Sequence, residues 1–110
     1  MDRQEFEVTV REAFEDIDRA IETLALDGVE AYPVDAGLRL QFDDGSFIQL
    51  MRNDAQSQID VQQDTNVVPF YFDDIEEQWF SRKDERSLTD ILSEEIGKRI
   101  SRTIRFPDEL

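Results

Sequence analysis

The 110-residue chain contains neither cysteine nor histidine, and only two of its twelve basic residues are lysines. The absence of cysteine excludes disulfides, thiolate nucleophiles and thiolate metal sites. The absence of histidine removes the side chain that most often serves as a base near neutral pH and as a nitrogen ligand for zinc. Acid–base catalysis would require carboxylates with strongly shifted pKa values. We therefore expect a protein that is not an enzyme.

Long apolar runs are also missing. No segment approaches the roughly 18 apolar residues of a membrane span, and residues 1–5 lack the basic and apolar regions of a signal peptide. We therefore expect a cytoplasmic protein without a membrane partner. The chain is long enough for one modest hydrophobic core and too short for two, which predicts a single domain over residues 1–110.

Acidic residues greatly outnumber basic residues in this sequence. Twenty-seven Asp and Glu residues against twelve Lys and Arg residues give a net charge of −15, and residues 1–35 hold eleven acids against three bases. A surface this negative repels nucleic acid and anionic membranes, whereas metal ions and basic protein surfaces remain as partners. An acidic, lysine-poor surface is also typical of proteins that stay hydrated in concentrated salt, and this explanation of the charge stays open.

Two segments show the 3.6-residue periodicity of an amphipathic helix. The first runs from an N-cap at Asp2 to a stop signal at Gly28, and the second begins at the N-cap Ser87 and continues to Ile100. On the first helix, acidic side chains fall opposite the apolar stripe.

Three of these acidic residues, Glu15, Asp18 and Glu22, lie within about one quadrant of the first helix. Such a group could attract a hydrated hard cation, and oxygen ligands suit iron, manganese, calcium or magnesium better than a tight zinc site. The alternative is an ordinary solvated helix face.

Between the helices the apolar period changes from 3.6 to 2. The alternation predicts strands at residues 29–34, 38–42, 47–51, 58–62, 67–72 and 78–81, with a polar turn at residues 52–57. Pro33 predicts that the first strand lies at a sheet edge. The fold class is therefore α+β, a two-layer α/β sandwich in which two helices pack on one face of a five- or six-stranded antiparallel sheet. In the tail, residues 103–107, two apolar side chains are expected to pack against this body.

Several short strings occur in a fixed order along this pattern. They are Glu5-Phe6, Leu38-Arg39-Leu40-Gln41-Phe42, Asp44-Gly45-Ser46, Gln58-Ile59, Phe70-Tyr71-Phe72-Asp73, Gln78-Trp79, and Ser87-Leu88 with Ile91-Leu92 and Glu95. Their order and spacing resemble those of the frataxin family, in particular its bacterial iron–sulfur assembly branch, over residues 5–102.

The resemblance implies a monomeric accessory protein of iron–sulfur cluster assembly that binds Fe²⁺ or Fe³⁺ weakly and docks on the cysteine desulfurase and the scaffold protein. In that family, acidic residues of the first helix and first strand serve both roles. Carried over by position, the metal-binding residues are Glu15, Asp18, Glu22, Asp27 and Glu30. The partner-binding residues are Glu12, Asp18, Glu22, Met51, Arg52 and Asp60.

Two positions depart from the family pattern on its scaffold-docking surface. The family usually carries an exposed Trp where Asp60 stands, and an Asn where Met51 stands. Because exposed aromatic residues are common interface anchors, a frataxin-fold protein with a diverged partner is an alternative function. A second alternative is an acidic protein-binding module similar to a secretion chaperone, which is expected to form a dimer with an apolar groove.

Overall fold

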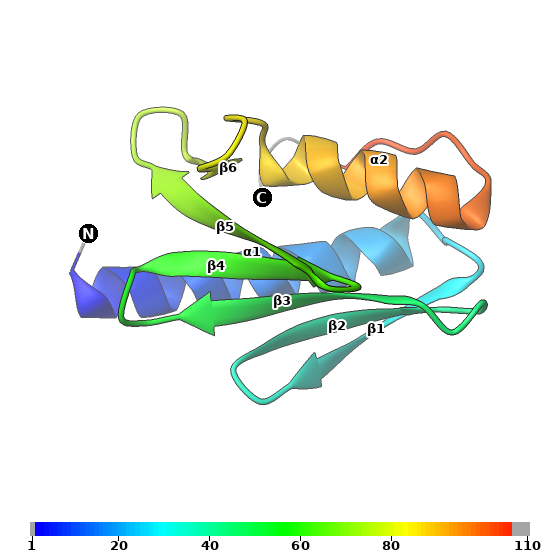
Figure 1. Cartoon of the computed structure of the whole chain (residues 1–110), viewed down its shortest axis with the longest axis horizontal. Helices are drawn as coiled ribbons and strands as arrows, with labels where there is room; N and C mark the ends of the chain where they lie inside the picture. Colours follow the sequence, from blue (N-terminus) through cyan, green and yellow to red (C-terminus); the bar gives the residue numbers. More distant parts are fainter. Residues whose placement is uncertain (1, 107–110) are drawn as a thin grey trace.

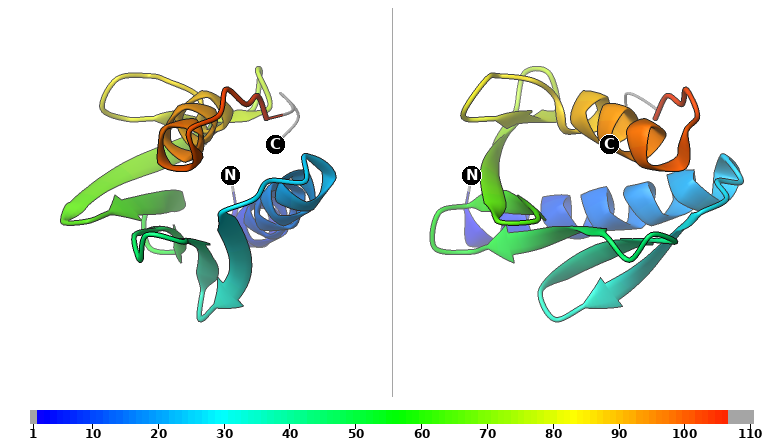
Figure 2. Two further views of the ribbon diagram at one scale, coloured as in Figure 1. Left: turned by 90° about the vertical axis from the view of Figure 1, so that its right-hand side faces the viewer. Right: turned by 45° about the vertical axis from the view of Figure 1, so that its right-hand side comes forward.

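A computed structural model describes residues 2–106 as two helices and six strands. The elements are α1 (Arg3–Thr23), β1 (Val29–Val34), β2 (Gly37–Phe42), β3 (Phe47–Asn53), β4 (Gln58–Gln63), β5 (Asn66–Asp73), β6 (Gln78–Ser81) and α2 (Leu88–Ile100). The strands form one antiparallel sheet in the order β1–β2–β3–β4–β5–β6, and both helices lie on the same side of it (Figures 1 and 2). The predicted two-layer sandwich is therefore confirmed with six strands. Within the described residues, neither helix is both long and apolar enough to cross a membrane.

Helix α1 begins as predicted and ends earlier. The Asp2 carboxylate accepts a hydrogen bond of 2.8 Å from the backbone N–H of Glu5, which caps the N-terminus. The predicted stop at Gly28 is wrong, because Leu24 caps the helix and Ala25 takes a left-handed φ of 50°. Gly28 instead lies in the turn that leads into β1, with a φ of 90°.

Strand β3 continues two residues beyond its predicted end. Arg52 and Asn53 pair with Ile59 and Gln58 of β4, so the predicted turn at residues 52–57 starts too early. On the other side of the strand, the backbone N–H of Arg52 donates to the carbonyl of Ala36 at 2.8 Å. Backbone pairing on both sides therefore keeps these polar residues in the sheet. At the sheet edge, β1 confirms the position that Pro33 predicts.

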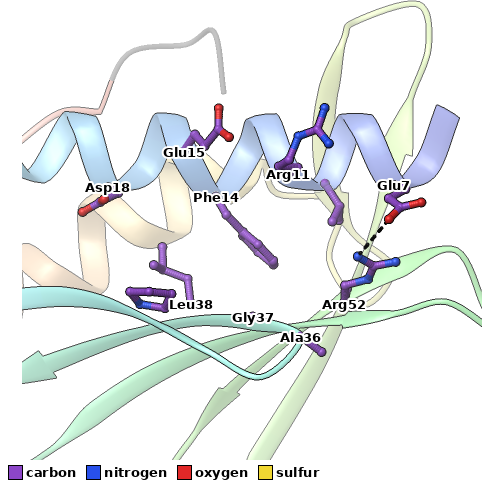
Figure 3. A pocket seen from close by; sticks show the side chains of 11 residues that line it. Glu7, Arg11, Phe14, Glu15, Asp18, Ala36, Gly37, Leu38 and Arg52 are labelled. Carbon is purple, nitrogen blue, oxygen red and sulfur yellow. Dashed lines mark ion pairs between the residues drawn. The ribbon is translucent and has the colours of Figure 1, made fainter. Parts of the chain in front are cut away.

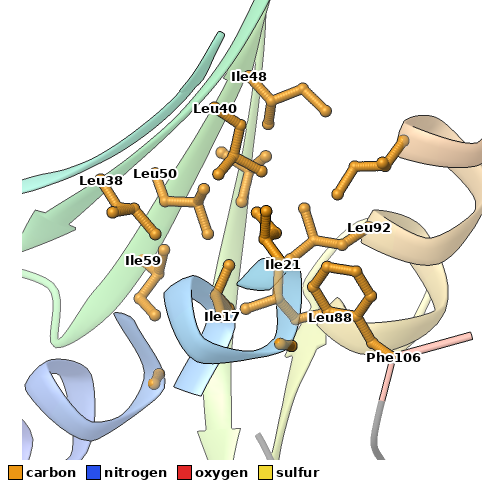
Figure 4. Close-up of a cluster of buried hydrophobic side chains, with 14 of the residues drawn as sticks. Ile17, Ile21, Leu38, Leu40, Ile48, Leu50, Ile59, Leu88, Leu92 and Phe106 are labelled. Atoms are coloured by element: carbon orange, nitrogen blue, oxygen red, sulfur yellow. The ribbon is translucent and has the colours of Figure 1, made fainter. Parts of the chain in front are cut away.

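The core fills the space between the sheet and the two helices (Figure 4). Fully buried side chains come from both layers, among them Ile17 on α1, Leu40, Ile48, Leu50 and Ile59 on the sheet, and Leu92 on α2. The tail closes this core as expected, since Phe106 is 1% exposed and its backbone N–H donates to Ser93 Oγ at 2.9 Å. Ile104 packs partly buried against the same cluster, whereas residue 107 lies outside the described residues.

Candidate functional site

Six exposed carboxylates follow α1 and continue into β1, and we call them the acidic ridge. They are Glu12, Glu15, Asp18 and Glu22 on α1, Asp27 in the following turn, and Glu30 on β1. The apolar stripe of α1 faces the sheet, which leaves the helical members of the ridge in solvent. Across residues 2–106, none of the six forms an ion pair with an Arg or Lys side chain. The ridge therefore presents negative charge without a direct ion-pair partner among residues 2–106.

The helical part of the ridge is a row of carboxylates. A rise of about 1.5 Å per residue separates Glu15 from Asp18 by roughly 4.5 Å along the axis, and Asp18 from Glu22 by roughly 6 Å. No group of three or more carboxylates within the described residues is gathered closely enough to hold a metal ion. The oxygen donors fit a hard cation such as iron in chemical type. Their spacing suits a hydrated ion held by electrostatic attraction better than a tight coordination site.

The remaining two predicted metal residues lie apart from this row. Asp27 belongs to the turn between α1 and β1. Glu30 pairs in register with Gln41 of β2, and its neighbour Val29 is buried on the helix side. Because side chains alternate along a strand, Glu30 points to the outer face of the sheet, the face away from the helices. The ridge therefore passes around the sheet edge.

Met51 and Asp60, the two departures from the family pattern, are directly opposite each other in the pairing of β3 with β4. Both belong to the outer face, since their neighbours Leu50 and Ile59 are fully buried on the helix side. The Asp60 carboxylate accepts a hydrogen bond from Gln58 Nε2 at 2.8 Å and another from the Asn53 amide at 3.2 Å. The position where the resemblance leads us to expect an aromatic anchor is thus a carboxylate held by amide side chains.

Arg52 does not share the face of Met51 and Asp60. Its guanidinium donates to Asp54 Oδ1 at 2.9 Å and lies 3.9 Å from Glu7 Oε1 on α1. Hydrogen bonding to Asp54 raises the pKa of Arg52, and the same bond lowers the pKa of the Asp54 carboxyl. The predicted partner-binding residues therefore fall on two different faces, with Arg52 on the helix side.

A groove between α1 and the β1–β2 turn was not predicted. It has a volume of about 300 Å³, and Val10, Phe14, Pro33 and Leu38 supply its apolar lining (Figure 3). By its spacing Phe14 belongs to the apolar stripe of α1, yet its side chain is only half-buried. The position of Phe14 at the border of that stripe, about 60° from its centre at 100° per residue, is the one signal in the sequence that points to this groove.

The six-stranded antiparallel sheet with two helices on one face and an acidic first helix defines the class as a frataxin-like sandwich. A family model described as a frataxin-like domain matches residues 1–102, and the chain belongs to the frataxin family. A solved structure of a frataxin from Psychromonas ingrahamii, described as a model for stability within the CyaY protein family, superposes with a TM-score of 0.90. That alignment covers 97% of this chain and 99% of the other at 19% sequence identity, which shows a shared fold. No curated protein matches the sequence significantly.

Proposed function

We propose that this frataxin-family protein is a cytoplasmic, monomeric accessory of iron–sulfur cluster assembly without catalytic activity. Iron binds weakly along the acidic ridge, and the ridge docks on a basic surface of the cysteine desulfurase. Family membership supports the role in cluster assembly. The observation that supports the ridge is that its six carboxylates are exposed and, within residues 2–106, form no ion pairs with Lys or Arg.

The proposed attraction is electrostatic. A divalent cation about 6 Å from a carboxylate gains about 1.4 kcal/mol in water before screening. Several carboxylates in a row therefore give weak binding that depends on salt, because the screening length is about 8 Å at physiological ionic strength. The same negative field steers a basic protein surface toward the ridge and raises its association rate.

The iron proposal can be tested with two variants of equal charge. The ridge variant combines Glu15→Gln, Asp18→Asn and Glu22→Gln. The turn variant removes three exposed acids from the β5–β6 turn and combines Asp74→Asn, Glu76→Gln and Glu77→Gln. Anaerobic titration with Fe²⁺ should broaden or shift amide NMR signals of α1 in the wild type and the turn variant. The same titration should leave α1 unchanged in the ridge variant. If both variants lost the Fe²⁺-induced changes in the α1 signals to the same extent, a role specific to the ridge would be contradicted.

Docking is tested by titration calorimetry with the purified cysteine desulfurase at low and high salt. We expect the ridge variant to bind at least tenfold more weakly than the turn variant at low salt, and all differences to shrink at high salt. Failure of the wild type to bind at low salt would support the diverged-partner alternative.

One specific observation favours the alternative that this frataxin-fold protein has a diverged partner. On the outer face, Asp60 places a charge where an interface anchor is expected, and Met51 lies opposite it. If the scaffold contact persists in this protein, Asp60→Trp should strengthen it; no gain would indicate a different partner on this face. Membership of the frataxin family disfavours the alternative of a secretion-chaperone-like module.

A further inference from the structure

The groove between α1 and the β1–β2 turn, which we call the α1–turn groove, contains apolar surface that the fold does not cover. Phe14 projects from α1 toward Leu38, and Pro33 and Val10 complete the apolar lining (Figure 3). Phe14 remains half-buried, although Val10 and Leu38 beneath it are almost fully buried. Covering apolar surface stabilises a complex by about 25 cal/mol per Å². An apolar group that enters the groove would therefore gain free energy from a ring that now contacts water.

The walls of the groove are fixed by the fold. The Ala36 carbonyl is bonded to the backbone N–H of Arg52 at 2.8 Å, which attaches the β1–β2 turn to β3. Next to it, Gly37 packs so closely on β3 that an added Cβ would lie 2.0 Å from the Leu50 carbonyl oxygen. A ligand would therefore meet a preformed site and would not have to order a loop.

The two ends of the groove differ in charge. One end is closed by the ion pair between Arg52 and Glu7, and a second carboxylate, Asp54, also neutralises Arg52. The other end carries Asp18, which forms no ion pair within the described chain (Figure 3). Arg11 and Glu15 also line the groove and offset each other in formal charge. The open end is therefore negative, within a protein of net charge −15.

We propose that the α1–turn groove binds a segment of a partner protein that inserts a bulky apolar side chain beside Phe14 and places an Arg or Lys side chain against Asp18. The volume of about 300 Å³ is at the small end of ligand sites and matches one or two side chains. The charge of the open end selects a basic segment and rejects an acidic one. This inference goes beyond iron and desulfurase binding by the ridge, because it adds an apolar contact on the same helix.

The test uses two fluorescein-labelled peptides of equal charge in iron-free buffer, Arg-Arg-Leu-Phe-Arg-Arg and Arg-Arg-Ser-Ser-Arg-Arg. The Leu-Phe peptide should bind wild-type protein at least tenfold more tightly, which corresponds to about 1.4 kcal/mol. It should also shift the amide signals of Phe14, Gly37 and Leu38. The Ser-Ser peptide should bind only through charge, so its affinity should fall steeply with salt.

Three variants separate the apolar contact from the charge. Pro33→Ala removes part of the apolar lining from an exposed position, and Phe14→Ala removes the ring; each should weaken the preference for Leu-Phe and leave Ser-Ser binding unchanged. Asp18→Asn should weaken both peptides. Circular dichroism checks that each variant is folded, and Pro33→Ala alone provides the test if Phe14→Ala does not fold.

Equal affinity of the two peptides for the wild type, or a preference that survives both groove variants, overturns the proposal. Amide shifts confined to the outer face of the sheet would do the same. Neither iron nor desulfurase is present in this experiment. Its failure is therefore distinguishable from failure of the proposed function, which is measured with those two components.

Discussion

Neutralising the helical part of the acidic ridge should make the protein more stable. Glu15, Asp18 and Glu22 are like charges on adjacent turns of α1, and none has an ion-pair partner within residues 2–106. Two carboxylates about 6 Å apart repel by about 0.7 kcal/mol in water, and salt screening over a Debye length of about 8 Å halves this value. The two adjacent pairs therefore cost about 0.7 kcal/mol together, in agreement with about 0.2–0.5 kcal/mol for each like-charge pair on a helix. This value is an upper limit, because Arg11 and Arg19 on neighbouring turns attract Glu15 and Glu22 without forming ion pairs with them.

The ridge variant tests this value, because Gln and Asn keep the shape of the side chains and nearly the same helix propensity. For a domain of this size, 0.7 kcal/mol corresponds to a rise of about 3 °C in Tm. Thermal unfolding followed by circular dichroism at 150 mM salt should show a rise of up to this size, and a larger one at 20 mM salt, where the screening length is longer. At 1 M salt the wild type and the variant should unfold together, since the screening length falls to about 3 Å.

The turn variant is the matched control, because it removes three exposed charges from a loop where no helical turn holds them in a row. It should gain clearly less stability than the ridge variant. An unchanged or lowered Tm of the ridge variant at low salt would refute the reasoning, because it would mean that the ridge carboxylates do not repel one another in the folded state. The same rise in both variants would assign the effect to net charge alone.

Three further outcomes concern the fold that supports the ridge and the groove, each measured by urea unfolding. Phe106→Ala should lower the free energy of unfolding by about 3 kcal/mol, because a 1%-exposed ring leaves a cavity between the helices and the tail; a loss below 1 kcal/mol would contradict this packing. Gly37→Ala should be strongly destabilising, since its Cβ would meet the Leu50 carbonyl at 2.0 Å, and a neutral result would contradict the close approach. Hydrogen bonds from the Ser46 hydroxyl and backbone N–H lower the pKa of Asp44. This stabilisation is present above the unfolded pKa and is lost as pH falls through the folded pKa, so Asp44→Ala should be less stable than wild type at pH 7, with a smaller difference at pH 3.

Local periodicity was sufficient to predict the layers of the fold. The change from a 3.6-residue to a 2-residue repeat after the first helix placed β1 at its observed residues, and Pro33 predicted its edge position. The ends of elements were harder, because contacts distant in sequence decide them. Nothing in the sequence near Ala25 distinguishes it from a helical alanine, yet it adopts a φ of 50° and ends α1. Likewise, β3 extends through Asn53 because β4 offers backbone partners on one side, and on the other side the Ala36 carbonyl in the β1–β2 turn accepts from the Arg52 N–H.

In the candidate sites, too, local pattern predicted some features, whereas others depend on contacts between residues distant in sequence. Helical projection predicted that the acidic side chains of α1 share a solvent face, since such a prediction requires only the helix itself. The strand pattern could not predict that Arg52 and Met51 point to opposite faces, because the predicted strand ended before Arg52. The α1–turn groove could not be predicted from the sequence for a related reason. It needs the turn at Ala36 to be bonded to β3, a contact between residues far from Phe14 in the sequence.

The acidity of the chain has two competing explanations, and the structure shows where they differ. Exposed acids without an ion pair, within the described residues, occur on the ridge and also in the β5–β6 turn, at Asp74, Glu76 and Glu77. Hydration in concentrated salt depends on the amount of exposed charge, so the ridge and the β5–β6 turn would contribute to it equally. Binding of iron or of a basic surface depends on carboxylates being held in a row on a rigid element, a condition that α1 meets and a turn does not. The ridge and turn variants remove the same charge from two such different elements. A difference between them in iron or desulfurase binding therefore assigns function to the ridge, and equal behaviour assigns its acidity to solubility.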